Sequence, residues 1–282
     1  MRFHMAGAEL FVPDGLAAEA ALTRTTRMGI SAHQDDLEIM AFHGILDGFG
    51  RDDRWFAGVV VTDGAGSPRD DLYAPFSDDE MKAVRRKEQE KAAVVGELGS
   101  MALLNYPSSV VKDGKETCVV EDLARLLSVA RPETVYTHNL ADKHDTHVAV
   151  ALRTVAAVRA LPAAGRPARL YGCEVWRDLD WLPDEEKVAL DVSAHENLQA
   201  ALLGVFDSQI CGGKRYDLAT MGRRRAHATY HASHGVDEAS GLTFAMDLTP
   251  LVTDPTRDPL DLAVSLIEKF RKDVEARVDK LR

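Results

Sequence analysis

The chain has 282 residues, of which 45 are Asp or Glu and 34 are Lys or Arg, so its formal net charge is −11. Hydrophobic residues make up 45% of the sequence, a share typical of globular proteins, which excludes a disordered or collagen-like chain. The acidic balance disfavours nucleic acid and anionic membrane surfaces as partners, because both attract clustered Lys and Arg. A small molecule, a metal ion or another protein remains compatible with this charge.

The cysteines and the N-terminal segment bear on the compartment. Cys118, Cys173 and Cys211 are odd in number and widely spaced, which excludes a disulfide framework and a cysteine-based zinc site. The segment MRFHMAGAELFVPDG lacks the apolar core of a signal peptide. No stretch reaches the ~18 consecutive apolar residues of a membrane span. These features predict a cytoplasmic protein without a membrane partner.

Short apolar runs alternate with helical patterns through the first half of the chain. The expected strands are 27–32, 56–62, 101–105, 134–138 and 170–176, and the expected helices are 78–98, 119–130 and 145–160. Ser77 and Glu80 have the spacing of a capping box at the start of the helix 78–98. The alternation predicts an α/β fold with a Rossmann-like, mostly parallel sheet and helices on both faces.

The pattern becomes less regular after Pro183. Helices are expected at 194–206 and 216–231, a strand at 242–248, and an amphipathic terminal helix at 259–282. We expect this helix to pack on the body, although pairing of subunits into a homo-oligomer stays open. No convincing linker interrupts the chain, which predicts one domain over 1–282, with a core at about 25–180 and an extension at about 181–282.

Loops rich in His and Asp follow two of the predicted strands. His33 and Asp36 come after the strand 27–32, and His144 and His147 come after the strand 134–138. The carboxyl ends of parallel strands carry the reactive groups of open α/β sheets. Two imidazoles and a carboxylate are a usual ligand set of hydrolytic zinc sites, which keep a fourth position for water. One His-x-x-Asp pair is more often a loop pair or a cap, but both pairs at one sheet edge predict a metal site.

The same loops resemble the motifs of the PIG-L/LmbE-like zinc-dependent N-deacetylases, a family that includes N-acetylglucosaminyl deacetylases. Ala32-His33-Gln34-Asp35-Asp36 resembles the motif A-H-P-D-D, and Asp142-x-His144-x-x-His147 resembles D-x-H-x-D-H. The segment 61–66 (VTDGAG) is similar to the second-strand motif T-D-G-G, and 85–92 is similar to R-x-x-E-x-x-x-A. The resemblance runs from about residue 27 to 150 and is loose in the second half.

The resemblance implies an enzyme, a metal-dependent amide hydrolase that removes an acetyl or other acyl group from an N-acetylated amino sugar or its conjugate. His33, Asp36 and His147 would hold one Zn²⁺ per chain, with Fe²⁺ or Co²⁺ as alternatives. Asp35 would be the general base for the attack of metal-bound water on the linear C–N amide bond. His144 would donate to the oxyanion and then protonate the leaving amine.

Two departures from the family motifs affect this interpretation. Gln34 stands in place of Pro and is expected to change the stiffness of the loop more than the chemistry. Thr146 stands in place of an Asp that would orient or tune the catalytic His144. Asp142 and Asp145 are close enough in sequence to supply that carboxylate; without it, the acid step would be weaker.

Candidate substrate contacts and two alternative functions remain. Asp63, Gly64, Arg85 and Arg86 are candidate substrate residues, with a solvated helix face as the alternative for the arginines. A catalytically weak or non-catalytic sugar-binding module of the same fold is favoured only by Thr146. A metal-dependent phosphoesterase is disfavoured because lysines are scarce at the strand ends.

Three further histidines lie at helical spacing in the sequence RRRAHATYHASH. His227, His231 and His234 have no neighbouring Glu in the place that an HExxH metal site requires. They are therefore expected to be partly exposed or to lie at the rim of a pocket.

Overall fold

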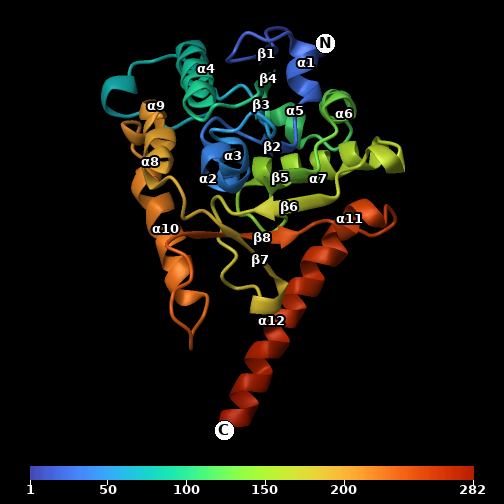
Figure 1. Ribbon diagram of the computed structural model, residues 1–282, viewed down its shortest axis with the longest axis vertical. Coiled ribbons are helices and arrows are strands. Elements are labelled where there is room, and N and C mark those ends of the chain that lie inside the picture. The colour runs from blue at the N-terminus through green and yellow to red at the C-terminus, as the bar shows by residue number, and fades with distance from the viewer.

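The computed structural model describes residues 1–282, in which an eight-stranded sheet runs through the molecule (Figure 1). The strand order is β1-β4-β3-β2-β5-β6-β8-β7. The strands β4, β3, β2, β5 and β6 are parallel to one another, whereas β1, β7 and β8 each pair antiparallel with a neighbour. The predicted α/β fold with a mostly parallel sheet is confirmed. The strands are β1 Glu9–Phe11, β2 Arg27–Ser31, β3 Phe56–Thr62, β4 Ser100–Tyr106, β5 Thr134–His138, β6 Arg169–Cys173, β7 Lys187–Asp191 and β8 Leu242–Asp247.

The longer helices lie where the sequence pattern predicted helices, whereas the short helices were not predicted. The long helices are α4 Asp78–Val95, α6 Cys118–Ala130, α7 Asp145–Ala160, α8 Glu196–Gly204, α10 Tyr216–Tyr230 and α12 Pro259–Leu281. The predicted capping box at the start of α4 is confirmed. β1, β7 and the short helices were not predicted, because a few residues contain too little periodicity to identify an element. The short helices are α1 Ala18–Thr23, α2 Asp36–Met40, α3 Phe42–Gly48, α5 Ser108–Lys112, α9 Asp207–Ile210 and α11 Pro250–Thr253.

Alternate residues of the central strands enter two separate hydrophobic cores. On β3, Val59 and Val61 belong to the core beneath α6 and α7, whereas Phe56 and Val60 belong to the core beneath α2, α3, α4 and α8. Successive side chains of a strand point to opposite faces, so a strand that is apolar at every position is buried on both. This explains why β3, with the sequence FAGVVVT, is buried along its whole length.

Two paired glycines let the short helix α2 approach the sheet. Gly29 of β2 is paired with Gly58 of β3, and Leu37 of α2 packs over both. A Cβ atom at Gly29 would lie 2.6 Å from Cδ2 of Leu37 and 2.7 Å from Cζ of Phe56. Both side chains are buried and cannot move freely. The glycines therefore set the height of α2 above the sheet, and with it the position of Asp36 at the start of α2.

A buried carboxylate ties the second half of the chain to the parallel sheet. Glu174, just after β6, accepts hydrogen bonds from the backbone N–H groups of Leu179 (2.6 Å) and Phe244 (2.8 Å), and its carboxylate lies 3.0 Å from Nε2 of His227. The expectation that His227 is partly exposed is wrong, because this ring is buried and stacks on Phe244. His227 therefore helps to hold α10 against β8.

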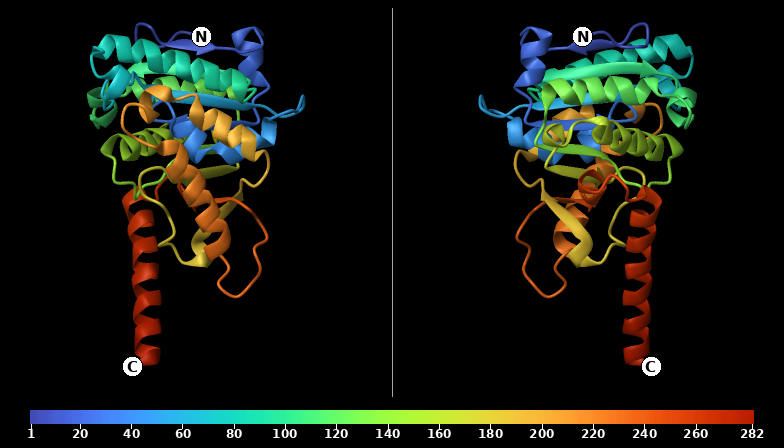
Figure 2. Two further views of the ribbon diagram at one scale, coloured as in Figure 1. Left: turned by 90° about the vertical axis from the view of Figure 1, so that its left-hand side faces the viewer. Right: turned by 90° about the vertical axis from the view of Figure 1, so that its right-hand side faces the viewer.

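The prediction that the terminal helix packs on the body is correct only for its first turns. Leu262, Ala263 and Leu266 are buried, but Phe270 is 39% exposed and Leu281 is 80% exposed. Both views in Figure 2 show the rest of α12 projecting away from the body. No helix in the structure combines the length and apolar character needed to cross a bilayer.

Gly29→Ala tests the role of the glycine pair. The added methyl group must displace Leu37 or Phe56, so we expect the free energy of unfolding to fall by about 1–3 kcal/mol in urea denaturation. Gly114→Ala is the matched control, because a Cβ atom there meets nothing within 4 Å. Equal stability of the two variants would contradict this account of α2.

Candidate metal centre and adjoining cavity

The candidate residues come together where the strand order changes direction. The chain leaves β2 toward β3 and β4 on one side, while β5 pairs with β2 on the other side. The loop after β2 contributes His33 and Asp35, and Asp36 begins α2; the loop after β5 leads to His144 and to His147 at the start of α7. Such a switch point leaves a crevice beyond the carboxyl ends of the strands.

Three donor atoms form a nearly equilateral triangle at this crevice. Nδ1 of His33 lies 3.1 Å from Nε2 of His147 and 3.2 Å from Oδ2 of Asp36, and these last two atoms are 3.4 Å apart. Zinc bound tetrahedrally at 2.0–2.1 Å would separate its ligand atoms by about 3.3 Å. The three side chains fit a divalent metal ion in both chemistry and spacing.

A neighbouring carboxylate orients His147 toward the triangle. Oδ2 of Asp142 lies 3.2 Å from Nδ1 of His147, so that nitrogen donates to the carboxylate and Nε2 keeps its lone pair for the triangle. Asp142 is buried, whereas Asp145 is exposed. Of the two acids considered near Thr146, only Asp142 reaches this centre, and its partner is the ring of His147.

His138, the last residue of β5, is a buried neighbour of the triangle that was not among the predicted ligands. Its ring stacks on His147 at 3.9 Å between centroids, and its Nε2 lies 3.5 Å from Oδ2 of Asp36. That nitrogen already accepts a hydrogen bond from the backbone N–H of Ala32 at 2.9 Å. Its lone pair is therefore occupied, which favours the set His33, Asp36 and His147. Only its place at a strand end marked it in the sequence.

The charges of the centre favour an ionised Asp36 among mostly neutral imidazoles. Burial opposes the charge of Asp36, but His147, His138 and His33 together hold its pKa well below the usual range. Burial lowers the pKa of His33, and it lowers that of His138 strongly. Burial also disfavours the charged form of His147, but Asp36 and Asp142 outweigh it and raise the pKa of this ring.

Asp35 lies beside the triangle in an unusual backbone conformation. Its φ of 90° is in the left-handed region, which costs a non-glycine residue free energy and is found at functional sites. Its backbone N–H donates to Oε1 of Gln89 (3.3 Å), and its carboxylate lies 4.0 Å from the guanidinium of Arg85. Burial, followed by repulsion from Asp36, raises its pKa well above the usual range, and Arg85 opposes the shift.

His144 has no carboxylate partner in the structure. Neither of its ring nitrogens lies within 4.0 Å of an acidic side chain, and Asp142 accepts instead from the backbone N–H of His144 at 3.1 Å. Burial lowers the pKa of His144, and the charges of His147 and His33 lower it further. No carboxylate replaces the family acid at Thr146, whose buried side chain lines the adjoining cavity.

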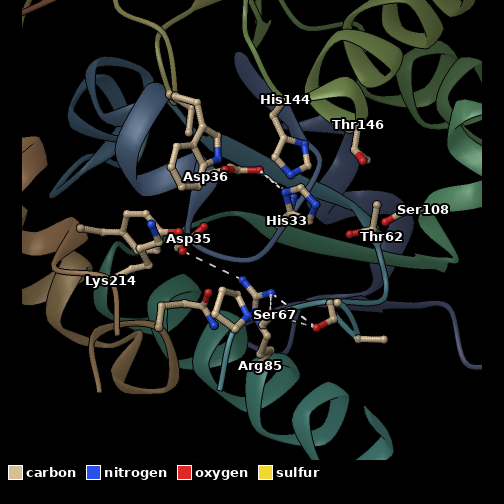
Figure 3. A pocket seen from close by; sticks show the side chains of 18 of the residues that line it. His33, Asp35, Asp36, Thr62, Ser67, Arg85, Ser108, His144, Thr146 and Lys214 are labelled. Atoms are coloured by element: carbon tan, nitrogen blue, oxygen red, sulfur yellow. Dashed lines mark hydrogen bonds and ion pairs between the residues drawn. The ribbon is translucent and has the colours of Figure 1, made fainter. Parts of the chain in front are cut away.

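The triangle opens into a cavity of about 390 Å³ (Figure 3). Val175 and Trp176, after β6, and Lys214 and Tyr216, before and in α10, form one wall. Figure 3 shows Thr62 and Ser108 on the side opposite Lys214. The remaining lining residues are His33, Asp35, Asp36, Ile39, Gly64, Ala65, Gly66, Ser67, Pro68, Arg85, Lys112, His144, Thr146 and Gln209. The wall from the second half corresponds to no sequence motif, and its residues were therefore not predicted.

The candidate substrate residues are divided between the cavity and the surface. Gly64 and Arg85 line the cavity, and Arg85 is held by the backbone carbonyl of Gln34 at 2.7 Å. Asp63 does not line it; its carboxylate lies 3.3 Å from the ammonium of Lys82. Arg86 is exposed and pairs with Glu9 and Glu90 away from the cavity.

His231 and His234 lie outside the cavity as well. His231 is half-buried, and its ring lies beside Phe244 with centroids 5.3 Å apart, whereas His234 is exposed. With His227 in the core, none of the three histidines of α10 and its C-terminal end lines the cavity. His231 and His234 therefore agree with the partly exposed alternative rather than with the pocket rim, and His227 with neither.

Residues 28–158 match the family described as PIG-L: GlcNAc-PI de-N-acetylase, which confirms the predicted resemblance over this part of the chain. A search of curated protein sequences finds no match. Among solved structures, the chain is similar to the conserved protein TT1542 from Thermus thermophilus, with 22% identity, coverage of 77% of this chain and 92% of that one, and a TM-score of 0.59.

Two further solved structures share the fold. The 4-carboxy-2-hydroxymuconate hydratase GalB from Pseudomonas putida KT2440 has 16% identity, coverage of 79% of this chain and 95% of that one, and a TM-score of 0.60. The N,N′-diacetylchitobiose deacetylase from Pyrococcus horikoshii has 19% identity, coverage of 78% and 83%, and a TM-score of 0.56. At these identities the similarity establishes the fold.

Asp142→Asn tests the orientation of His147. The amide weakens the contact with Nδ1 of His147, so we expect the affinity for Zn²⁺ to fall by about 10–100-fold in a titration against a competing chelator. Asp145→Asn removes the same charge three positions along from Asp142, at an exposed site, and should leave the affinity unchanged. Equal weakening by both variants would indicate a general charge effect and contradict the assigned contact.

Proposed function

We propose that the protein is a zinc-dependent hydrolase that removes an acetyl or related acyl group from an N-acylated amino sugar or its conjugate. The observation that carries the proposal is the triangle of His33, Asp36 and His147 beside a buried, unligated Asp35 at the end of a cavity. The match of residues 28–158 to the PIG-L family supports the amino-sugar substrate class. One continuous sheet supports treating residues 1–282 as one domain.

Zn²⁺ held by His33, Asp36 and His147 would polarise the acyl carbonyl and acidify a water molecule. In the proposed reaction, the carboxylate of Asp35 takes a proton from that water as its oxygen attacks the acyl carbon. Asp35 is adjacent in sequence to Asp36 but is not part of the triangle, so its oxygens are available for this proton. The guanidinium of Arg85, 4.0 Å from the carboxylate of Asp35, favours the ionised base against the burial and the charge of Asp36, which raise the pKa of Asp35.

His144 is the proposed donor to the oxyanion and to the leaving amine. Its ring lies 5.1 Å from that of His33 and 4.5 Å from that of His147, measured between centroids, at the cavity side of the centre. The C–N bond breaks as the nitrogen gains this proton, and the products are the free amine and the carboxylic acid. Because no carboxylate supports the charged form of His144, this step is the weaker part of the machinery.

The aromatic wall of the cavity suits the sugar. Trp176 and Tyr216 meet edge to face with ring centroids 6.0 Å apart, and both line the cavity. A ring that is partly apolar and partly hydroxylated packs on such aromatic faces while polar groups fix its orientation. Thr62, Ser67, Ser108 and Gln209 supply those polar groups. We propose that residues from the second half thereby select the sugar.

Acetate release from N-acetylglucosamine and its glycosides, including N,N′-diacetylchitobiose, tests this function. We expect one Zn²⁺ per chain and release that stops after chelation and returns with Zn²⁺. Since a hydratase shares the fold, substrate consumption without acetate would contradict the proposal. Full zinc loading without turnover of any N-acyl sugar would instead favour a binding module, and phosphate release without acetate would favour a phosphoesterase.

Asp35→Asn tests the general base. Loss of the proton acceptor should lower kcat by about 10²–10⁴-fold, while metal content measured by mass spectrometry stays near that of the unaltered protein. Asp36→Asn is the comparison, because it should lose metal as well as activity. Equal loss of zinc from both variants would show that Asp35 is a ligand rather than a base.

Trp176→Ala tests the aromatic wall. Removal of the indole should raise KM by about tenfold, which corresponds to about 1.4 kcal/mol of lost binding, with a smaller change in kcat. Trp176→Phe keeps an aromatic face and should restore most of the affinity. An unchanged KM in the alanine variant would place the sugar elsewhere in the cavity.

A further inference from the structure

The terminal helix α12 exposes an apolar stripe that its own chain covers only in part, at Phe270, whose ring lies 6.3 Å from that of Trp181 between centroids. The exposed apolar residues of this helix, called the α12 stripe, are Leu260, Val264, Ile267, Phe270, Val274, Val278 and Leu281. Each of them is between 39% and 80% exposed, whereas Leu262, Ala263 and Leu266 of the same helix are buried against the body. Figures 1 and 2 show the C-terminal part of α12 separated from the rest of the chain.

The spacing of the α12 stripe is that of a coiled coil. Leu260, Ile267, Val274 and Leu281 are seven residues apart, and Val264 and Val278 follow members of this series by four residues. Alternating steps of three and four place a continuous seam on one side of a helix, which a second helix can cover. The seam runs through the whole of α12.

One polar residue interrupts the seam. Arg271 occupies the position between Val264 and Val278 in the repeat, and its guanidinium pairs with Glu268 and Glu275 of the same helix. A single polar residue at such a position is a known device that fixes the register of a coiled coil at some cost in stability. Arg271 is therefore compatible with pairing of this face of α12 against a second helix.

The charges of α12 favour a protein partner over a membrane. Residues 259–282 contain five acids and six bases, so the negative charge of the protein resides in the remaining chain. A helix that lies on an anionic membrane has a polar face rich in Lys and Arg, whereas this face carries both signs. A nearly neutral arm that projects from an acidic body is also the part that a second copy approaches with least repulsion.

The borders of the stripe favour a parallel pair over an antiparallel one. Asp261, Glu268, Glu275 and Arg282 lie along one border, and Ala263, Phe270 and Arg277 lie along the other. A parallel pair sets unlike borders of its two helices against each other, so the acidic rows do not meet. Such a two-fold contact uses the same surface on both chains. We propose that the α12 stripe pairs two copies of this chain through a parallel coiled coil.

Mass measurement of the full chain by light scattering and sedimentation velocity tests this pairing at concentrations up to about 100 µM. We expect a species of twice the 30.9 kDa of one chain. Ile267→Glu with Val274→Glu puts charges into the seam at exposed positions and should raise the dimer Kd by about 100-fold or more. Circular dichroism verifies that the variant remains folded.

Lys272→Ala with Lys280→Ala is the matched control. It changes the net charge by the same amount at exposed positions outside the stripe and should leave the dimer intact. A monomer at every concentration, or a dimer that survives the two glutamates, would overturn the proposal. Binding of the monomer to anionic phosphatidylserine vesicles through α12 would also overturn it, in favour of a membrane partner.

Discussion

The buried carboxylate of Asp36 is the constraint on which the rest of the site depends. Its Oδ2 accepts from the backbone N–H of His33 at 2.7 Å and lies within 3.5 Å of ring nitrogens of His33, His138 and His147. A buried carboxylate is costly unless groups that favour its charge surround it, and here those groups come from two different strand ends. The carboxylate thereby joins the β2 and β5 loops, and a divalent ion between them would compensate its charge.

The fold supplies the place for this centre but does not specify the reaction. A deacetylase and a hydratase both share the architecture at similar TM-scores. What distinguishes a reaction is the identity of a few side chains at the sheet edge, because function resides in sites built on a fold. In this chain the buried Asp35 beside the triangle is the group on which the proposed hydrolysis depends, and Thr146 leaves the ring of His144 without a carboxylate partner.

The α/β class and most long elements were predictable because their signals are local. Strand and helix periodicities, the capping box at Ser77 and the His and Asp residues at strand ends each lie within a short window of sequence. The short elements, the packing of α12 and the buried position of His227 were not predictable. Each of these depends on contacts with residues far away in the chain, such as the contact between Glu174 and His227 at 3.0 Å.

The sequence by itself determined which donor groups the protein carries and that His33, Asp36 and His147 follow strands of a parallel sheet. Only the tertiary structure decided that their donor atoms meet at 3.1–3.4 Å and that Asp142 orients His147. It also decided that Nε2 of His138, the nitrogen nearest to Asp36, accepts a hydrogen bond from the backbone N–H of Ala32. It also brought Trp176 and Tyr216 to the cavity. The physical reason is that strand order, which sets loops side by side, results from packing of the whole chain, whereas a sequence window records local preference alone.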